Sequence, residues 1–236
     1  MSDPSEKSIA DPSAPPHARL AVWLAVLALA WGLLAAVVYW QQGLTLSHYD
    51  AKGHLVVARR VLDSLTPGWL QLGAVWLPLP HVLNLLPVQV DAWYRTGASG
   101  IAISMLSMAL LVYCSARLIL RFTRSRVGAA IAVLLIITNP NLLYLQSTPM
   151  TEPLLLGLIA LALWCTVQAL DDGAGGRWLR ASGALALAMM TRYEAWPVAG
   201  ALLAATVVAR WRQGAGVRRG MSDALRLASL PAATLT

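Results

Sequence analysis

The sequence has little charge for its size. Only 12% of its 236 residues are Asp, Glu, Lys or Arg, against about a quarter in soluble domains. Hydrophobic residues make up 58% of the chain, and the mean hydropathy is +0.61. A soluble domain could not keep so many apolar residues away from water, so the composition excludes that class and predicts an integral membrane protein.

Cysteine, phenylalanine and acidic residues are also scarce. The two cysteines, Cys114 and Cys165, fall inside apolar runs, where we expect them to pack without forming a disulfide. A single Phe stands against ten Trp, a residue typical of membrane interfaces. The net charge is +7, but the arginines form short clusters between apolar runs. This pattern excludes nucleic-acid binding and favours a chain that crosses a membrane several times.

Apolar runs divide the chain into predicted membrane spans. Residues 1–19, rich in Pro, Ser and Asp, are expected to be a disordered cytoplasmic tail. The fold class predicted for residues 20–236 is an all-α polytopic domain of about six to seven transmembrane helices. The predicted spans are Leu20–Trp40, Ala98–Leu120, Val127–Thr138 with a break at Asn139-Pro140 and a continuation through Leu142–Leu145, Pro153–Leu170, Leu179–Met190, Pro197–Val208 and a seventh that begins near Ala224.

The distribution of basic residues predicts the orientation of these spans. With the N-terminus in the cytoplasm, the clusters Arg117 to Arg126 and Arg210 to Arg219 lie on the cytoplasmic side, as the positive-inside rule requires. Residues 41–97, 139–152 and 191–196 then lie outside. We therefore expect a multi-pass protein of the plasma (inner) membrane with a cytoplasmic N-terminus.

The first external segment, residues 41–97, is too long to be a plain connection. Apolar residues recur at three- and four-residue spacing from Asp50 to Leu65, which predicts an amphipathic helix on the membrane surface or on the bundle. Asp50 would begin this helix, where the helix dipole favours a carboxylate. Thr66-Pro67-Gly68 would end it, and a second short helix is expected near His81–Leu86.

The order of these features has a family resemblance. One transmembrane helix is followed by an acidic residue and by a long loop with two interfacial helices. The stretches that carry the resemblance are "HYDAKGHLVVARRVLDSL", "WLPLPHVLNLLP", "NPNLLYLQSTPMTEPLLLGLIALA" and "GALALAMMTRYEAWPVAGALLA". Over residues 20–210 the chain resembles the GT-C class of integral-membrane glycosyltransferases, and in particular its protein-mannosyltransferase and aminoarabinose-transferase-like branch.

The resemblance implies a sugar transfer at the outer membrane surface. The donor would be a polyprenyl-phosphate sugar, and the acceptor a lipid, a glycan or a protein. Asp50 would be the general base that takes the proton of the acceptor hydroxyl; its structural alternative is a helix N-cap. Glu152 would be a second acid that holds the acceptor, a metal or the catalytic loop. Its structural alternative is an ordinary helix start before a proline.

Four further residues are candidates for substrate binding. Arg192 suits the donor phosphate through its planar fork of N–H donors, or it forms a water-exposed turn with Glu194. His81 lies near the phosphate or makes interfacial hydrogen bonds, and Arg59 contacts the donor or lipid headgroups. His48 and His54 are six residues apart, which is not the spacing of a helical zinc pair. No metal site is therefore predicted, and a requirement for a divalent metal stays open.

Two departures from the family pattern leave alternatives. Many relatives have two adjacent acids in the first loop, whereas Asp50 is followed by Ala51. Relatives also continue through more helices, so this chain is expected to correspond to the N-terminal half of such an enzyme. A non-catalytic or truncated membrane subunit is the main alternative. A transporter or flippase is disfavoured because the predicted spans lack ionisable residues in their interiors.

Overall fold

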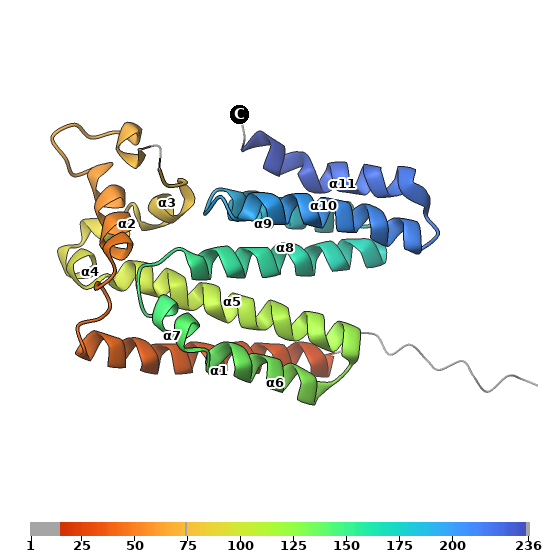
Figure 1. Cartoon of the computed structure of the whole chain (residues 1–236), viewed down its shortest axis with the longest axis horizontal. Helices are drawn as coiled ribbons and strands as arrows, with labels where there is room; N and C mark the ends of the chain where they lie inside the picture. The colour runs from red at the N-terminus through yellow and green to blue at the C-terminus, as the bar shows by residue number, and fades with distance from the viewer. Residues whose placement is uncertain (1–14, 74, 235–236) are drawn as a thin grey trace, which may run out of the picture.

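The computed structural model describes residues 15–73 and 75–234, and all regular elements in these residues are helices. The predicted all-α fold is confirmed (Figure 1). The elements are α1 (Pro15–Gln41), α2 (Tyr49–Arg60), the 3-10 helix η1 (Trp69–Leu72), α3 (Leu79–Asn84), the 3-10 helix η2 (Pro87–Gln89), α4 (Asp91–Thr96), α5 (Ala98–Thr123), α6 (Arg126–Ile137), α7 (Pro140–Gln146), α8 (Glu152–Asp172), α9 (Gly175–Met189), α10 (Ala195–Arg212) and α11 (Gly216–Ala233).

Three helices, α1, α5 and α8, are long and apolar enough to cross a membrane. Helices α6 and α7 are bent by 66° relative to each other, and together they would form a fourth span. The bend occurs at the predicted break, because Asn139 caps α7 with its side chain and Pro140 occupies the first turn. The chain is therefore a multi-pass membrane protein, and a count of six to seven spans stays a prediction.

Two predicted boundaries differ from the structure. Helix α1 begins at Pro15, so residues 15–19 of the expected tail are helical, while residues 1–14 lie outside the described residues. The amphipathic helix of the long loop ends at Arg60 instead of Leu65. It ends early because the chain turns: the amides of Leu62 and Asp63 both bond to the carbonyl of Arg59.

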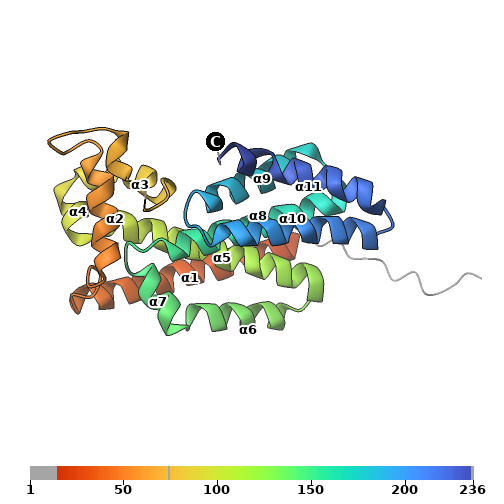
Figure 2. The same cartoon turned by 45° about the horizontal axis from the view of Figure 1, so that its top comes forward.

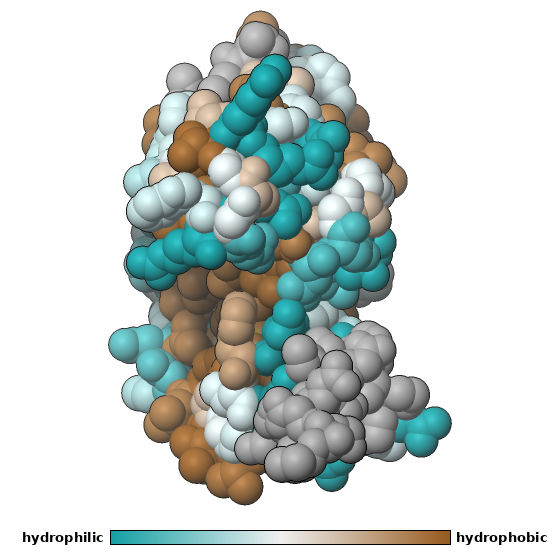
Figure 3. Space-filling view, turned by 90° about the vertical axis from the view of Figure 1, so that its right-hand side faces the viewer, coloured by the Kyte–Doolittle hydropathy of each residue, from teal (hydrophilic) through white to brown (hydrophobic). Residues whose placement is uncertain are grey.

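The long helices run side by side, so their connections gather at two opposite ends (Figures 1 and 2). In Figure 1 the helices α2, α3 and α4 of the first predicted external segment lie at the left-hand end, where α2 crosses the bundle. The other two predicted external segments, residues 139–152 and 191–196, lie on the side of the bundle that faces these helices. The arginine-rich connections lie at the other end. Figure 3 looks onto that end and shows hydrophilic side chains gathered there.

A close approach between α5 and α8 holds the centre of the bundle together. A Cβ atom added at Gly157 of α8 would lie 2.6 Å from the carbonyl oxygen of Ser107 in α5. A Cβ atom at Gly100 would lie 2.5 Å from Pro149, in the link before α8. Ser104 of α5 bonds through its hydroxyl to the carbonyl of Met150, 3.0 Å away. Small residues therefore allow the two backbones to meet, as is common between membrane helices.

We expect Gly157→Ala to destabilise the folded protein by about 2 kcal/mol, because its methyl group would push against backbone that cannot rotate away. The matched control is Gly200→Ala in α10, where an added Cβ meets nothing within 4 Å. The thermal unfolding midpoint of the detergent-purified variants measures the difference. Equal midpoints for the two variants would contradict this account of the α5–α8 contact.

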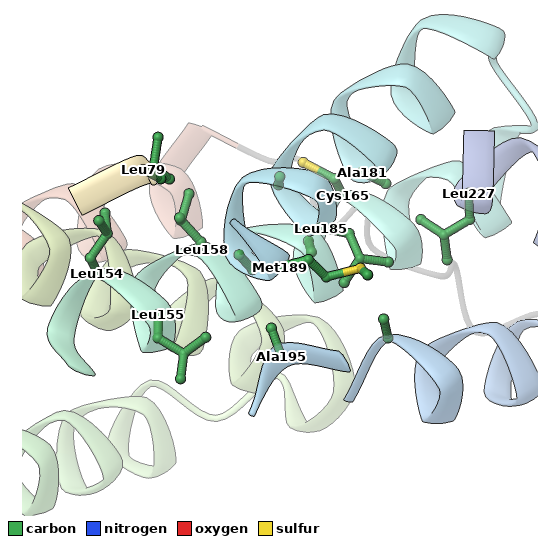
Figure 4. Close-up of a cluster of buried hydrophobic side chains, with 14 of the residues drawn as sticks. Leu79, Leu154, Leu155, Leu158, Cys165, Ala181, Leu185, Met189, Ala195 and Leu227 are labelled. Atoms are coloured by element: carbon green, nitrogen blue, oxygen red, sulfur yellow. The ribbon is translucent and has the colours of Figure 1, made fainter. Parts of the chain in front are cut away.

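The largest buried cluster connects the long loop to the bundle. Leu79 of α3 packs beside Leu154 and Leu158 of α8, while Leu185 and Met189 of α9 belong to the same cluster (Figure 4). The backbone amide of Leu79 also donates to the carbonyl of Met190, at 3.0 Å. The loop is thus fixed to the end of α9 and to the start of α8.

Both cysteines are buried free thiols, as predicted from their apolar surroundings. Cys165 belongs to the cluster that contains Leu79, and Cys114 packs in a second one with Trp164. Their role in the fold is packing.

Candidate functional site

A pocket of about 270 Å³ opens where three connections meet. One wall is the start of α2, a second is the segment before α3, and a third is formed by the start of α8 with the α9–α10 link. Its lining residues are Asp50, His54, Val75, Trp76, Leu77, Thr151, Thr191, Arg192, Tyr193 and Glu194. Three predicted site residues, Asp50, Arg192 and Glu194, therefore meet around one cavity.

Arg192 is the centre of an ion-pair network at this pocket. Its Nη1 donates to Glu152 Oε1 at 2.9 Å and to the Thr151 hydroxyl at 3.1 Å. Its Nη2 donates to Glu194 Oε1 at 2.7 Å. The hydrogen bond to Glu194 raises the pKa of Arg192 further, and the same bond lowers the pKa of Glu194. These shifts keep Arg192 and Glu194 charged, and the network ties the start of α8 to the α9–α10 link.

Asp50 has a different environment. It lies in the first turn of α2 and is half-buried at the edge of the pocket. The helix cap is not Asp50 but His48, whose Nδ1 accepts from the backbone amide of Asp50 at 3.2 Å. The N-cap interpretation of Asp50 is therefore wrong. The reason is register: α2 begins at Tyr49, which places Asp50 inside the helix.

Asp50 is also the one acidic residue in the described part of the chain that forms no ion pair. Its carboxylate accepts no hydrogen bond from the described residues. Its negative charge makes a small contribution to the raised pKa of Arg192. A carboxylate without a partner at a pocket wall is available to a ligand.

Two histidines form a buried pair behind the pocket. His54 Nδ1 lies 3.1 Å from His81 Nε2, and His81 Nδ1 lies 3.2 Å from the carbonyl oxygen of Leu77. Burial lowers the pKa of His54 to about 3, with smaller contributions from His81 and Arg192, and lowers that of His81 to about 4. Both rings are neutral at physiological pH. His81 is fully buried and does not line the pocket itself, but it contacts two lining residues, His54 and Leu77.

Arg59 lies outside the residues that line the pocket. It donates to Asp63 at 2.8 Å and to Asp91 at 2.6 Å, and its guanidinium covers the ring of Tyr94 at 4.6 Å. This arrangement ties α2 to α4, and a contact between Arg59 and the donor stays a prediction. Glu152 lies in the first turn of α8, as expected, and its buried Oε2 has no hydrogen-bond partner among residues 15–73 and 75–234.

No group of three or more His, Cys, Asp or Glu side chains with the spacing of a metal site occurs in residues 15–73 and 75–234.

A comparison with protein-family models assigns residues 95–221, more than half of the chain, to one family, described as dolichyl-phosphate-mannose-protein mannosyltransferase. The chain belongs to this mannosyltransferase family. It is accordingly a membrane glycosyltransferase of the GT-C type, in agreement with the resemblance of its loop and helix-end motifs. Comparisons with curated proteins and with solved structures give no match.

The part matched to the mannosyltransferase family includes Glu152, Arg192 and Glu194 but not the first external segment with Asp50. From the sequence, Trp76 is one of several aromatic residues expected to be interface anchors or, for one of them, to stack on a sugar ring. His54 is expected to make interfacial hydrogen bonds rather than to bind a metal, and Thr151 is not predicted as a site residue. The structure brings all three to the pocket wall. The one signal that could have indicated Thr151 is its position beside Glu152 at a helix start.

Proposed function

We propose that the chain transfers a sugar from a polyprenyl-phosphate donor to an acceptor hydroxyl at the pocket, and that Asp50 is the general base. The observation that carries this proposal is the free carboxylate of Asp50 beside Arg192 in one cavity. A carboxylate held in an ion pair is a poor base, because its partner stabilises the charged form. Asp50 alone among the pocket acids lacks such a partner.

In the proposed reaction, the acceptor oxygen attacks the anomeric carbon of the donor sugar while Asp50 takes its proton. The bond between the anomeric carbon and the phosphate oxygen breaks, and the polyprenyl phosphate leaves with the electron pair. The acceptor is a lipid, a glycan or a protein, all of which offer a hydroxyl group.

Arg192 is proposed to stabilise the leaving phosphate. A guanidinium has five N–H donors. Contacts with Thr151, Glu152 and Glu194 use the Nε donor, both donors of Nη1 and one of Nη2. One N–H of Nη2 is left for a phosphate oxygen. Glu152 and Glu194 would hold the fork in place, and positively charged donors suit a developing negative charge.

The lipid part of the donor is supported by a second cavity. A groove of about 560 Å³ runs between α1 and the start of α5. Its lining is apolar apart from Thr96 and includes Leu33, Trp40 and Met105. We propose that the polyprenyl chain lies in this groove, with the sugar at the same end of the bundle. In this proposal that end faces the periplasm, the N-terminus is cytoplasmic, and the membrane is the plasma (inner) membrane.

The experiment that tests the donor class compares two labelled donors of one sugar. Membranes that contain the chain are given either polyprenyl-phosphate-mannose or GDP-mannose, and the label in the acceptor fraction is counted. We expect transfer from the lipid-linked donor and none above empty membranes from the nucleotide donor. Transfer from GDP-mannose in the presence of an inhibitor of lipid-linked sugar synthesis would overturn the proposal.

A further inference from the structure

The histidine pair behind the pocket has a defined pattern of protons. The carbonyl oxygen of Leu77 can only accept, so Nδ1 of His81 carries the hydrogen in their 3.2 Å contact. A neutral imidazole has one N–H, which makes Nε2 of His81 an acceptor. The partner of that acceptor, Nδ1 of His54, must then donate across 3.1 Å. Nε2 of His54 is left with a lone pair.

This assignment depends on neutral rings, which the surroundings provide. A charged His81 would donate from both nitrogens and would reverse the direction of the contact. His81 is fully buried and His54 is 5% exposed. Burial accordingly lowers the pKa of both histidines, to about 4 for His81 and about 3 for His54, so neither ring is charged at pH 7.

The His54 side chain lines the pocket, and its Nε2 takes no part in the contact with His81. None of the described residues makes a hydrogen bond to Nε2 of His54, although its Nδ1 is occupied. His54 lines the same cavity as Asp50 and Arg192. Since His54 is 5% exposed and lines this cavity, a hydroxyl would reach the lone pair from the pocket.

The local sequence is adapted to hold the pair in place. The ring of Trp76 lies against that of His54, with 4.4 Å between ring centroids. A Cβ atom at residue 53 would lie 2.6 Å from the Trp76 ring, so Gly53 leaves the room that this contact needs. His81 lies two residues after Leu79, whose backbone amide donates a hydrogen bond to the carbonyl of Met190 at the end of α9. The two rings are thus fixed from both sides.

We propose that His54 is a substrate-binding residue, whose Nε2 accepts a hydrogen bond from a hydroxyl of the donor sugar or of the acceptor, and that His81 is the residue that positions it. The inference rests on the proposed function, since it adds a residue to the same pocket. A neutral acceptor complements Asp50: it orients a hydroxyl without adding charge beside the carboxylates.

The first test is independent of activity. The chain has four histidines, so the ¹⁵N resonances of each ring can be assigned by single substitutions in labelled, detergent-purified protein. At pH 7 we expect both His54 and His81 in the neutral form with the proton on Nδ1. Addition of polyprenyl-phosphate-mannose or of the acceptor should shift the Nε2 resonance of His54. A proton on Nε2 of His54 would overturn the inference even if the protein transfers sugar.

The second test separates the hydrogen bond from packing. In His54→Asn the amide nitrogen can replace Nδ1 and keep the bond to His81, but no atom replaces Nε2. We expect kcat/KM for transfer to fall about tenfold, the loss of one hydrogen bond. His54→Gln extends an amide oxygen towards the position of Nε2 and should lose less than about threefold. His17→Asn, at the opposite end of α1, is the matched control.

The KM values identify the source of the hydroxyl. A rise in the KM of the donor assigns the hydroxyl to the sugar, and a rise in the KM of the acceptor assigns it to the acceptor. Wild-type rates for His54→Asn, or equal losses for His54→Asn and His54→Gln, would overturn the inference. An inactive wild-type chain would instead reject the proposed function, and the ¹⁵N measurement would then decide the inference by itself.

Discussion

Replacement of Asp50 by Asn is expected to lower the rate of sugar transfer by about a hundredfold or more, the usual contribution of a general base. Asn has nearly the same shape and keeps the helix position, but it cannot take a proton. Because the Asp50 carboxylate has no ion-pair partner in the part of the chain that the structure describes, its loss should leave the fold intact. The measurement is transfer from labelled polyprenyl-phosphate-mannose in membranes with matched amounts of protein.

The control for this prediction is Asp171→Asn, which removes a half-exposed carboxylate paired with Arg121 at the opposite end of the bundle. We expect transfer by this control within about twofold of wild type, since exposed ion pairs contribute little. The Asp50 variant should also unfold at the wild-type temperature. If Asp50→Asn transfers sugar at the same rate as the control, Asp50 is not the general base. A lowered unfolding temperature of Asp50→Asn would indicate a structural role.

Replacement of Asp223 by Asn is expected to be the most destabilising of these changes, by about 3–5 kcal/mol. Asp223 of α11 is fully buried and accepts from Nε of Arg210 at 2.7 Å. Arg210 also donates to the carbonyl of Leu170 at the end of α8, at 2.8 Å. Loss of the carboxylate would leave the buried charge of Arg210 without a counter-ion, at the point where α8, α10 and α11 meet.

The thermal unfolding midpoint of the purified protein measures this effect, with Asp171→Asn again as the control. The two acids belong to ion pairs of similar length but of different burial: the side chain of Asp171 is 40% exposed and that of Asp223 is 0% exposed. We expect a loss of several degrees for Asp223→Asn and a loss near zero for the control. Similar midpoints for the two variants would contradict the prediction, because the buried Arg210–Asp223 pair would then contribute no more to stability than the exposed Arg121–Asp171 pair.

Helix positions were largely predictable, because they depend on local features. Long apolar runs predicted α1, α5 and α8, and Asn139-Pro140 predicted the bend between α6 and α7. The end of α2 was placed five residues too late, since the apolar spacing continues to Leu65. There a tertiary contact overrides the local pattern: Arg59 is held by Asp91 of α4, and the backbone turns after Arg60.

The candidate site was predictable only in part. Asp50, Arg192 and Glu194 were identified from their positions at the ends of apolar runs, and the structure brings them to one pocket. Arg59 was identified from its place on the polar face of the loop helix, but it lies in an ion-pair network outside the lining. A charge at a helix end has the same appearance in the sequence whether it pairs with a neighbour or faces a cavity.

The sequence by itself determined the class of protein, the helix pattern and the end of the bundle where the acidic connections gather. These properties follow from composition and from spacing along the chain, which are local quantities. Only the tertiary structure decided which pocket carboxylate is free, which acids pair with Arg192, and which nitrogen of His54 keeps its lone pair. Those properties depend on distances between residues that are up to about 140 positions apart, such as Asp50 and Arg192, and a hydrogen bond acts over about 3 Å.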